Sequence, residues 1–448
     1  MGGPMKPRNI LRDADALSRR EILRLMAIGA LTVSALPARA EKTPSGKGTA
    51  RSVIQIWLSG GPTHLDTFDP KPEAGTEYMG PLRAIPTNVD GVQIGELLPL
   101  LAKQADKYSL LRGMTHGNNG HETAAYMVQT GWTPGGTLVH PCLSAVLTQR
   151  LIAAGSYKGL IPPYLVLTQP QGRFSEAGFL GQRCKPFATG GDPSQARFTV
   201  EGVVSKDLTP ERQEARKTLL GQVDALAQAG ATMPELAPAA ASEREAWELI
   251  LGPAGKVFDL GQEAKELRDK YGMNPFGQSC LAARRLVESG VPYITINFGG
   301  WDHHKQIFPA LRQKLPQLDR GVASLLEDLA SRGLLESTVV WVGGEFGRTP
   351  KVQPEAPWNG GRHHFGQAFS HLVAGGGFRG GSVIGATDKT GDTVKDRPIY
   401  PWDLIGSIYE RLGLSPEATV PHPSGYAVRV LPPMEAKTPT GGRLKELV

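Results

Sequence analysis

The sequence predicts an α/β protein in which a mostly parallel β-sheet carries helices on both faces. Short apolar runs typical of buried strands recur along the chain, and longer amphipathic stretches typical of helices separate them. Four glycine-rich segments that contain histidine or carboxylate residues each follow an apolar run. This placement is expected at the carboxyl ends of parallel strands, where polar site residues gather.

Each predicted element is a stretch whose pattern fits one class. The expected strands are residues 53–58, 109–112, 164–167, 293–298, 338–342 and 368–374. The expected helices are residues 99–107, 122–130, 210–227, 242–251, 277–289 and 308–332. Strands and helices that alternate in this way are typical of crossover connections within one sheet.

We expect one domain over residues 41–448, because the composition shows no clean break. Between residues 181 and 240 the alternation of strands and helices is lost, and the chain runs through a charged helical stretch and a Pro/Ala-rich stretch. We interpret this region as an insertion or cap over the sheet. A solvated linker is the alternative.

The first 40 residues predict a twin-arginine signal peptide. Arg19 and Arg20 precede an apolar stretch over residues 25–36, and Ala38-Arg39-Ala40 offers a small-x-small cleavage site. The stretch is shorter than the ~20 residues that span a bilayer, which favours cleavage over retention as an anchor. The expected partner is the twin-arginine translocase, and the expected location is periplasmic or extracellular.

Charge and cysteine content exclude two classes of protein. Residues 1–40 hold seven Lys/Arg and three Asp/Glu, so the net charge falls from +6 to +2 once they are removed. With no basic stripe interleaved with aromatic residues, no nucleic-acid partner is expected. The three cysteines show no CxxC spacing, so the fold does not depend on a disulfide framework.

Seven of the ten histidines lie in the four glycine-rich segments. Imidazoles and carboxylates at the ends of neighbouring strands are expected to meet at one divalent metal site. The four segments read GGPTHLDTFD, MTHGNNGH, FGGWDHH and GGRHHF.

The third segment supplies the strongest metal candidates, Asp302 and His304. A carboxylate and an imidazole on one short loop suit a borderline ion such as zinc, manganese or iron. His303 between them is expected to point away or to support a ligand. The alternative, in which Asp302 only caps the following helix, does not explain two adjacent imidazoles.

Carboxylates also follow two other strands. Asp66 follows the first strand and is expected to bind metal, while His64 is either a ligand or a supporting donor. Glu345 follows the strand at 338–342 and is expected to bind metal, with Arg348 close by to clamp an anionic group. A surface Glu–Arg pair is the alternative. His364 in the fourth segment adds a further imidazole.

Long motifs in this chain resemble those of one bacterial family. GGPTHLDTFDPKP, PLLAKQADKYSLLRGMTH, GGWDHH, EFGRTP and VAGGGFRGGSVIGATD are similar to the twin-arginine-exported family of domain of unknown function 1501. The resemblance covers residues 51–435. That family is in turn similar in fold to the alkaline phosphatase and sulfatase superfamily.

The superfamily resemblance implies two metal ions that clamp the attacking and leaving oxygens of a phosphate or sulfate ester. It implies one site built from Asp302, His304 and His364, and another from Asp66 and Glu345. The chain departs from the superfamily pattern at Glu345-Phe346, which replaces an Asp-His pair, and at the close spacing of Asp302 and His304. It departs from the usual pattern of its family at His363-His364-Phe365, which replaces Asp-His-Trp. We therefore expect one or two ions, zinc or manganese.

The superfamily's nucleophile has no clear counterpart here. Counting back from Thr130-Gly131 places His121 where the modified cysteine of sulfatases would lie, so a formylglycine sulfatase is not expected. Thr115 and Thr123 are candidate nucleophiles outside that position. For His121 we consider three roles, in this order: metal ligand, general acid, and helix N-terminal residue without catalytic duty.

Two functions are consistent with these features. The first is a metal-dependent hydrolase or transferase that acts on phosphate or sulfate esters of small molecules or glycans, with His121, Thr115 and Arg348 as candidate catalytic residues. The second is an exported binding or scaffold protein on the same fold that has lost catalysis.

Overall fold

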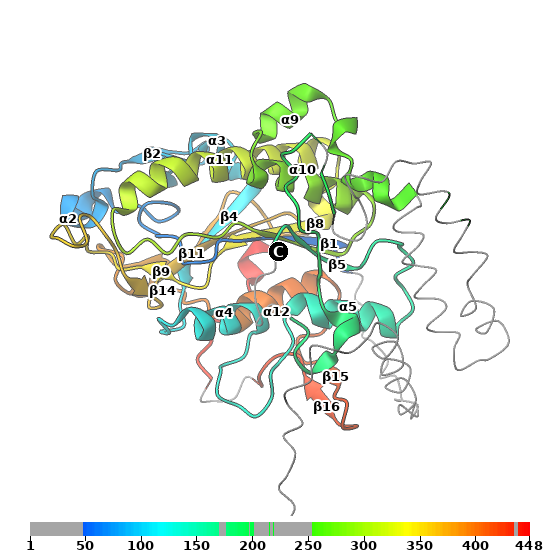
Figure 1. The fold of residues 1–448 in the computed structure, drawn as a ribbon. Helices are drawn as coiled ribbons and strands as arrows, with labels where there is room; N and C mark the ends of the chain where they lie inside the picture. The colour runs from blue at the N-terminus through cyan, green and yellow to red at the C-terminus, as the bar shows by residue number, and fades with distance from the viewer. Residues whose placement is uncertain are drawn as a thin grey trace, which may run out of the picture. The chain divides into compact units, whose positions relative to one another are not determined.

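A computed structural model describes residues 48–169, 176–196, 198–200, 253–433 and 438–448, together with residues 215 and 218. Residues 44–448 form one compact unit. Its centre is an eight-stranded sheet with the order β12-β4-β11-β8-β1-β7-β5-β6 (Figure 1). The strands are β1 (Ser52–Trp57), β4 (Tyr108–Met114), β5 (Tyr164–Leu167), β6 (Phe187–Ala188), β7 (Tyr293–Asn297), β8 (Thr338–Gly343), β11 (Phe369–Ala374) and β12 (Val383–Ile384).

The sheet is mostly parallel, as the sequence predicts. Seven strands run in one direction, and β11 alone is antiparallel to its neighbours β4 and β8. The expectation that every histidine segment follows a strand end is therefore wrong for the fourth segment, which lies before β11. Because β11 runs in the opposite direction, its beginning lies at the same edge as the carboxyl ends of the other strands.

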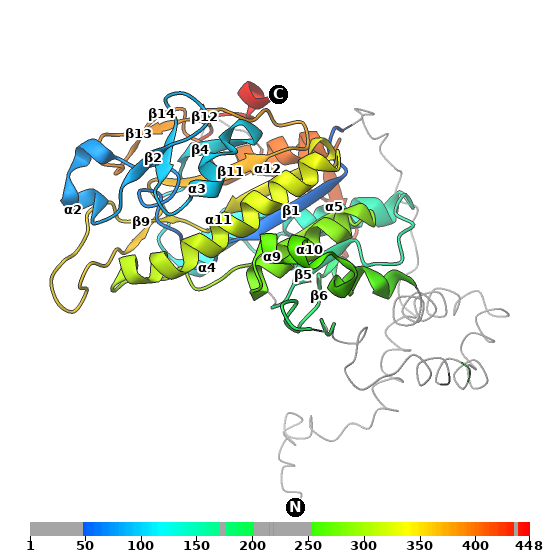
Figure 2. The same ribbon diagram turned by 90° about the horizontal axis from the view of Figure 1, so that it is seen from above.

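Helices cover both faces of the sheet (Figures 1 and 2). One face carries α3 (Pro99–Ala102), α9 (Lys265–Tyr271), α10 (Pro275–Glu288) and α11 (Ile307–Ser331). The other carries α4 (His121–Thr130), α5 (Leu143–Ala153) and α12 (Pro401–Arg411). Each face has its own apolar core, with Ile294 and Leu326 in the first and Tyr293 and Ile405 in the second. The alternation of strand side chains explains this division, because successive residues of β7 point to opposite faces.

The predicted strands match β1, β4, β5, β7, β8 and β11 to within one or two residues at each end. The expected helix at 99–107 is α3 followed by a short 3-10 turn (Ala105–Lys107), and the other described helices agree with α4, α10 and α11. We did not predict α5, α9 and α12. The signal peptide, most of the expected cap and the helices expected at 210–227 and 242–251 lie outside the described residues.

Short elements surround the sheet. A single-turn helix, α2 (Thr76–Met79), precedes the ribbon of β2 (Ala84–Pro86) and β3 (Gln93–Gly95). Three further two-stranded ribbons pair β9 (Gly347–Arg348) with β10 (His364–Phe365), β13 (Ala386–Thr387) with β14 (Val394–Asp396), and β15 (Thr419–Pro421) with β16 (Ala427–Arg429).

The register of the central strands brings three loops together. In β1, Trp57 pairs with Asn297 at the end of β7 and with Gly343 at the end of β8. The loops that follow are also joined, since the N–H of Trp301 donates to the carbonyl of Ser59 over 3.0 Å. The loops that follow β1, β7 and β8 therefore begin beside one another at the carboxyl edge of the sheet.

Local sequence explains where α4 begins and ends. Gly120 is its N-cap residue, so His121 is the first helical residue. Gly131 ends the helix in the left-handed conformation, with φ 75°, which costs glycine little. The helix thus presents His121 at the same edge of the sheet as the loops after β7 and β8.

The cysteines Cys142, Cys184 and Cys280 are free and buried, in agreement with the expectation that the fold does not depend on a disulfide framework.

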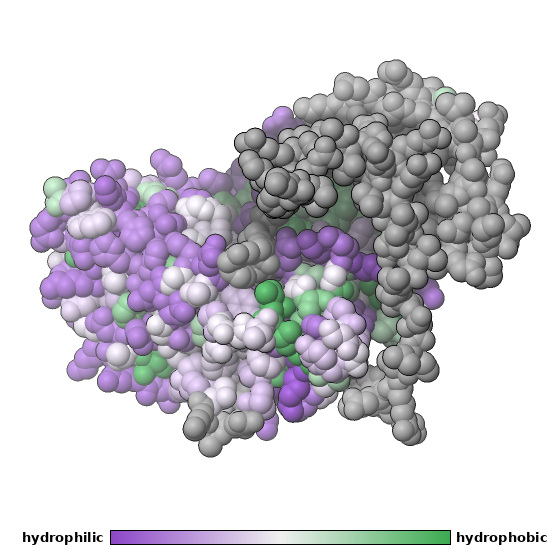
Figure 3. Space-filling view, turned by 60° about the horizontal axis from the view of Figure 1, so that its bottom comes forward, coloured by the Kyte–Doolittle hydropathy of each residue, from purple (hydrophilic) through white to green (hydrophobic). Residues whose placement is uncertain are grey.

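No helix among the described residues has the length and apolarity needed to cross a membrane. On the face shown in Figure 3, hydrophilic residues cover much of the described surface, and apolar residues form small groups.

Candidate metal centre

The structure brings together side chains from four separated segments at the carboxyl edge of the sheet. Asp302 and His304 lie in the loop after β7, and Glu345 follows β8. His121 begins α4, and His364 lies on β10. This convergence is the arrangement predicted for a metal site, and it includes four of the five predicted metal residues.

The carboxylate of Asp302 contacts three imidazoles. Its Oδ1 lies 3.0 Å from Nε2 of His304 and 3.0 Å from Nε2 of His364. Its Oδ2 lies 3.2 Å from Nε2 of His121. We call Asp302, His121, His304 and His364 the four-residue cluster.

Each imidazole of the cluster is also held at its other nitrogen. Nδ1 of His121 lies 2.6 Å from Oε1 of Glu345, and Nδ1 of His364 lies 2.9 Å from the carbonyl of Asn119. Nδ1 of His304 lies 3.0 Å from Nδ1 of His363. Metal-binding histidines typically have a polar partner at the second nitrogen, which fixes the tautomer and the direction of the ring.

The protonation that these partners impose fits a cation at the centre. Because a carbonyl and a carboxylate only accept hydrogen bonds, Nδ1 of His364 and of His121 carries hydrogen. In the neutral rings the Nε2 lone pairs then face the carboxylate of Asp302, so several acceptors point at one place. A divalent ion satisfies all of them at once, and protonation of the rings is the alternative.

The spacing of the donor atoms also fits an ion. Nε2 of His304 and Nε2 of His364 are 2.9 Å apart. Ligands of a tetrahedral zinc ion, with bonds of roughly 2.0–2.1 Å, lie about 3.3 Å from one another. The donor atoms of His121, Asp302 and His364 lie within 4.8 Å of one another. The set that meets this distance contains His121, Asp302 and His364, and His304 adjoins it through Asp302 and His364.

Ionisation favours a charged Asp302. Burial opposes the charged form, but the hydrogen bond from Arg348 and the interaction with His364 outweigh it and hold the pKa of Asp302 well below its usual value. The hydrogen bond to Glu345 raises the pKa of His121, whereas burial lowers the pKa of His304. The side chains of Asp302 and His121 are 44% and 38% exposed, so the centre is open to solvent.

Arg348 does not lie in the position of an open anion clamp. Its side chain is fully buried and donates to the carbonyls of Gly60 and Gly61 and to Oδ1 of Asp302. The guanidinium thus donates its hydrogen bonds to groups of the protein itself. Arg348 fixes the direction of the Asp302 carboxylate.

Glu345 is not a member of the four-residue cluster, but it contacts one member, His121. Its Oε1 accepts the N–H of Gly60 over 2.8 Å and contacts His121, and its side chain is 3% exposed. Its Oε2 is buried and has no hydrogen-bond partner among the described residues. The direct contact of Glu345 is therefore with the ligand candidate His121.

Asp66 is the one predicted metal residue that neither belongs to the four-residue cluster nor makes a hydrogen bond to it. It is fully buried and forms an ion pair of 3.0 Å with Nε of Arg362, which is also fully buried. Thr63 donates a further hydrogen bond to it over 2.9 Å. Because Arg362 balances its charge, Asp66 has the surroundings of a residue that stabilises the fold. His64 contacts the carbonyl of Gly391 over 2.9 Å and is likewise buried.

The candidate nucleophiles are also separate from the cluster. The N–H of Thr115 donates to the carbonyl of Ile399, and the hydroxyl of Thr123 binds Asn118 and the carbonyl of Gly120 at the start of α4. In the part of the chain that the structure describes, no hydrogen bond joins a Ser, Thr or Cys side chain to the four-residue cluster.

Sequence reasoning missed several supporting residues. His363 contacts His304 and is itself held by Oε1 of Gln353 over 3.0 Å. Its place beside His364 was the only signal for it. His303, by contrast, makes no hydrogen bond to the cluster among the residues that the structure describes.

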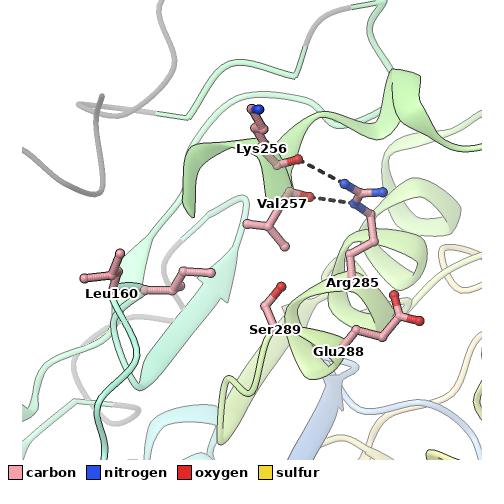
Figure 4. Close-up of a pocket in the computed structure, with 7 residues that line it drawn as sticks. Leu160, Lys256, Val257, Arg285, Glu288 and Ser289 are labelled. Carbon is pink, nitrogen blue, oxygen red and sulfur yellow. Dashed lines mark hydrogen bonds between the residues drawn. The ribbon is translucent and has the colours of Figure 1, made fainter. Parts of the chain in front are cut away.

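Two cavities lie at different positions relative to this centre. Figure 4 shows one of about 490 Å³ lined by Leu160, Lys256, Arg285 and Ser289, among others. The guanidinium of Arg285 donates hydrogen bonds there to the carbonyls of Lys256 and Val257. Ser289 precedes β7, so this cavity lies at the amino end of the parallel strands, opposite the metal centre.

A second cavity, of about 1010 Å³, adjoins the residues that support the cluster. It is lined by the loop at 349–355 together with Glu77, Phe365 and Asp392, among others. Gln353 in this wall holds His363, which in turn contacts His304. The cavity therefore lies beside the supporting residues of one ligand candidate.

Fold and site together define an α/β protein with a candidate metal centre at the carboxyl edge of its sheet. The chain belongs to the family described as Protein of unknown function (DUF1501), whose model matches residues 50–435. A comparison with curated protein sequences finds no match.

Solved structures similar to this chain come from the alkaline phosphatase superfamily and from related enzymes. A protein in that superfamily from Vibrio parahaemolyticus is 11% identical with a TM-score of 0.37, covering 96% of this chain and 78% of its own. The C-terminal periplasmic domain of EcEptC from Escherichia coli, in complex with Zn, is 11% identical with a TM-score of 0.37, covering 84% and 85%. The lipoteichoic acid synthase LtaP from Listeria monocytogenes is 10% identical with a TM-score of 0.35, covering 82% and 73%.

Proposed function

We propose that this protein is an exported metal-dependent hydrolase or transferase that acts on phosphate or sulfate esters. One observation carries the metal assignment: three imidazoles direct Nε2 at the carboxylate of Asp302, while each Nδ1 is held by another polar group. We propose one divalent ion, zinc or manganese, bound by the four-residue cluster. Nitrogen and oxygen donors in this ratio suit both ions.

The number of ions follows from the two carboxylates outside the cluster. A second ion would need Asp66 and Glu345, but Asp66 is neutralised by Arg362 in a fully buried pair. Glu345 is engaged with His121 and Gly60. We therefore propose one ion, with Glu345 as the residue that orients His121.

Bound at this position, a divalent ion supplies Lewis acidity toward the oxygens of an ester and toward water. Arg348 holds Asp302 in place and keeps it charged. We propose water, or the hydroxyl of an acceptor alcohol, as the nucleophile, because Thr115 makes no hydrogen bond to the cluster. The oxygen of the water or acceptor alcohol forms a bond to phosphorus or sulfur while the P–O or S–O ester bond breaks. The ester oxygen leaves with its alcohol, and the proton that the nucleophile loses balances the proton that the leaving alcohol takes up.

The substrate is proposed to be a small-molecule or glycan ester. The exposed side of Asp302 and His121 gives an ester access to the cluster. Anionic esters also suit a centre that carries a cation.

A catalytically inactive binding or scaffold protein is the second candidate. The observation that favours it is that no Ser, Thr or Cys side chain bonds to the cluster among the residues that the structure describes. The two candidates share the metal centre and differ in turnover.

Metal content and turnover decide between these functions. Protein recovered from the periplasm is analysed by plasma mass spectrometry and assayed against a panel of phosphate and sulfate esters. The proposal expects about one zinc or manganese ion per chain and turnover that Asp302→Ala abolishes. His303→Ala is the matched control, because His303 is adjacent in the chain but makes no hydrogen bond to the cluster among the described residues. Metal without turnover on any ester supports the scaffold, and protein without metal contradicts both.

Export is tested separately. We propose the periplasm or the extracellular space as the location and the twin-arginine translocase as the export partner. Replacing Arg19 and Arg20 with lysine in the full chain is expected to leave the protein in the cytoplasm. Export of that variant at the normal rate would contradict the proposed route.

A further inference from the structure

Two histidines outside the four-residue cluster contact the backbone of the loop that carries Glu345. Nε2 of His371, on β11, lies 2.9 Å from the carbonyl of Gly344. Nε2 of His116 lies 2.7 Å from the carbonyl of Glu345 itself. Two consecutive carbonyls of one loop are therefore each bound by an imidazole.

Both imidazoles have a fixed tautomer. Nδ1 of His371 accepts the indole N–H of Trp341 over 3.1 Å, and Nδ1 of His116 accepts the backbone N–H of Asn118 over 3.0 Å. Since the indole and the amide only donate, hydrogen must be on Nε2 in each ring, where the carbonyls of the loop accept it. Burial lowers the pKa of both histidines, which agrees with neutral rings.

The Gly-Gly step before Glu345 follows from this packing. A Cβ on Gly343 would lie 2.1 Å from Cδ2 of His371, and a Cβ on Gly344 would lie 2.5 Å from the carbonyl oxygen of Leu58. The His371 ring thus occupies the space that a side chain at 343 would need. Close approach of the ring requires glycine at this position.

The same loop then directs the Glu345 side chain at His121. Oε1 of Glu345 lies 2.6 Å from Nδ1 of His121 and 2.8 Å from the N–H of Gly60. A contact of 2.6 Å depends on where the loop backbone lies, because the side chain has little freedom at 3% exposure. The loop position in turn depends on His116 and His371.

We infer that His116 and His371 are positioning residues of the metal centre, which act on the ligand His121 through the loop backbone and the carboxylate of Glu345. This inference rests on the proposed function for its effect on metal binding. Neither histidine makes a hydrogen bond to the four-residue cluster. Their contribution is to hold Nδ1–H of His121 on Glu345 and so keep Nε2 directed at Asp302.

Paired variants separate the hydrogen bond from the volume of the ring. His371→Asn keeps an acceptor for Trp341 but lacks a donor that reaches Gly344, whereas His371→Gln places an N–H near the position of Nε2. His116→Asn and His116→Gln form the same pair. We expect each Asn variant to weaken zinc binding about tenfold, the scale seen when support of a ligand is lost. We expect each Gln variant to recover most of the affinity.

A double-mutant cycle with Glu345→Ala tests whether the effect passes through Glu345. Zinc affinity is measured by competition with a chromophoric chelator. In the Glu345→Ala background, His116→Asn and His371→Asn are expected to have no further effect. An equal loss of affinity in both backgrounds would show that these histidines only stabilise the fold, and would overturn the inference.

A second measurement does not need metal. In metal-free protein with ¹⁵N-labelled histidine, the Nδ1–H of His121 bound to Glu345 is expected as a protected, downfield signal. The two Asn variants and Glu345→Ala should each lose it, and the Gln variants should keep it. An unchanged signal in the Asn variants overturns the inference. If the wild-type protein binds no metal, the proposed function fails, and this signal still decides the role of His116 and His371.

Discussion

His304 and His364 face each other with their Nε2 atoms 2.9 Å apart, although 60 positions separate them in the chain. The oxygen Oδ1 of Asp302 lies 3.0 Å from both atoms. These two imidazole nitrogens and the carboxylate oxygen are three of the donors that we propose for the metal ion.

His304→Ala and His364→Ala are each expected to lower metal affinity tenfold or more, about the scale seen when a metal shell is disturbed. The reason is that each variant removes one of the donors that converge on Asp302. Affinity is measured by chelator competition on purified protein, with the thermal midpoint as a check on folding. The control His303→Ala should bind metal as the wild type does. Folded variants with undiminished affinity would refute the ligand assignment.

Asp66→Asn and Asp302→Asn should have opposite effects: the first should lower stability and the second should abolish metal binding. Asp66→Asn breaks the fully buried pair with Arg362 and is expected to lower the free energy of unfolding by about 3 to 5 kcal/mol while leaving metal affinity unchanged. Asp302→Asn, at a side chain that is 44% exposed, should abolish metal binding at a much smaller cost in stability.

Urea unfolding and metal titration of the same two preparations check this pair. If Asp66→Asn lost metal at unchanged stability, Asp66 would be a ligand, as the sequence first indicated, and the proposed count of one ion would be wrong.

Stability should fall in acid because of His371. Burial lowers the pKa of this histidine to about 4, so between pH 6.5 and 4 the unfolded chain binds the proton more readily than the folded protein. The stabilisation is complete above pH 6.5 and is lost as the pH falls toward 4, on the order of 3 kcal/mol for this group. Protonation at Nδ1 would also break the hydrogen bond from Trp341.

Unfolding free energies of the wild type and of His371→Asn, measured from pH 8 to pH 4, isolate the contribution. The variant should show a shallower decline over this interval, because asparagine does not titrate. Parallel curves would mean that His371 is not the group responsible.

Gly343→Ala is expected to destabilise the protein by several kcal/mol. Its Cβ would lie 2.1 Å from the ring of His371, which is fully buried and held at both nitrogens. Overpacking of this kind costs about 1 to 3 kcal/mol, with more for lost hydrogen bonds. Gly136→Ala is the control, because the nearest atom to its Cβ is 4.0 Å away. Thermal unfolding measures both, and equal midpoints would argue against close packing of His371.

The sequence predicted the convergence of the site because strand ends in a parallel sheet meet at one edge. Asp302, His304 and His364 could be placed in this way from glycine-rich segments beside apolar runs. The direction of β11 could not, because an apolar run has the same pattern in either direction. The fourth histidine segment nevertheless lies at the predicted edge, since an antiparallel strand begins where its parallel neighbours end.

Long-range pairing explains what sequence reasoning missed. Asp66 was predicted to bind metal because it follows the first strand, but Arg362, 296 positions away, lies against it. The local sequence around Asp66 contains no sign of Arg362, so the ion pair could not be predicted from it. His371 lies in the middle of an apolar strand, where a histidine normally packs in a core. Only the loop opposite, with the carbonyl of Gly344, gives it a further role.

Crystallography with anomalous scattering, on protein recovered from the periplasm, tests the metal centre most directly. Data collected on both sides of the zinc and manganese absorption edges identify the ion and its position. The proposal predicts one anomalous peak within about 2.0–2.2 Å of a carboxylate oxygen of Asp302 and of Nε2 of His121, His304 and His364. An anomalous peak beside Asp66, or none near Asp302, would contradict it.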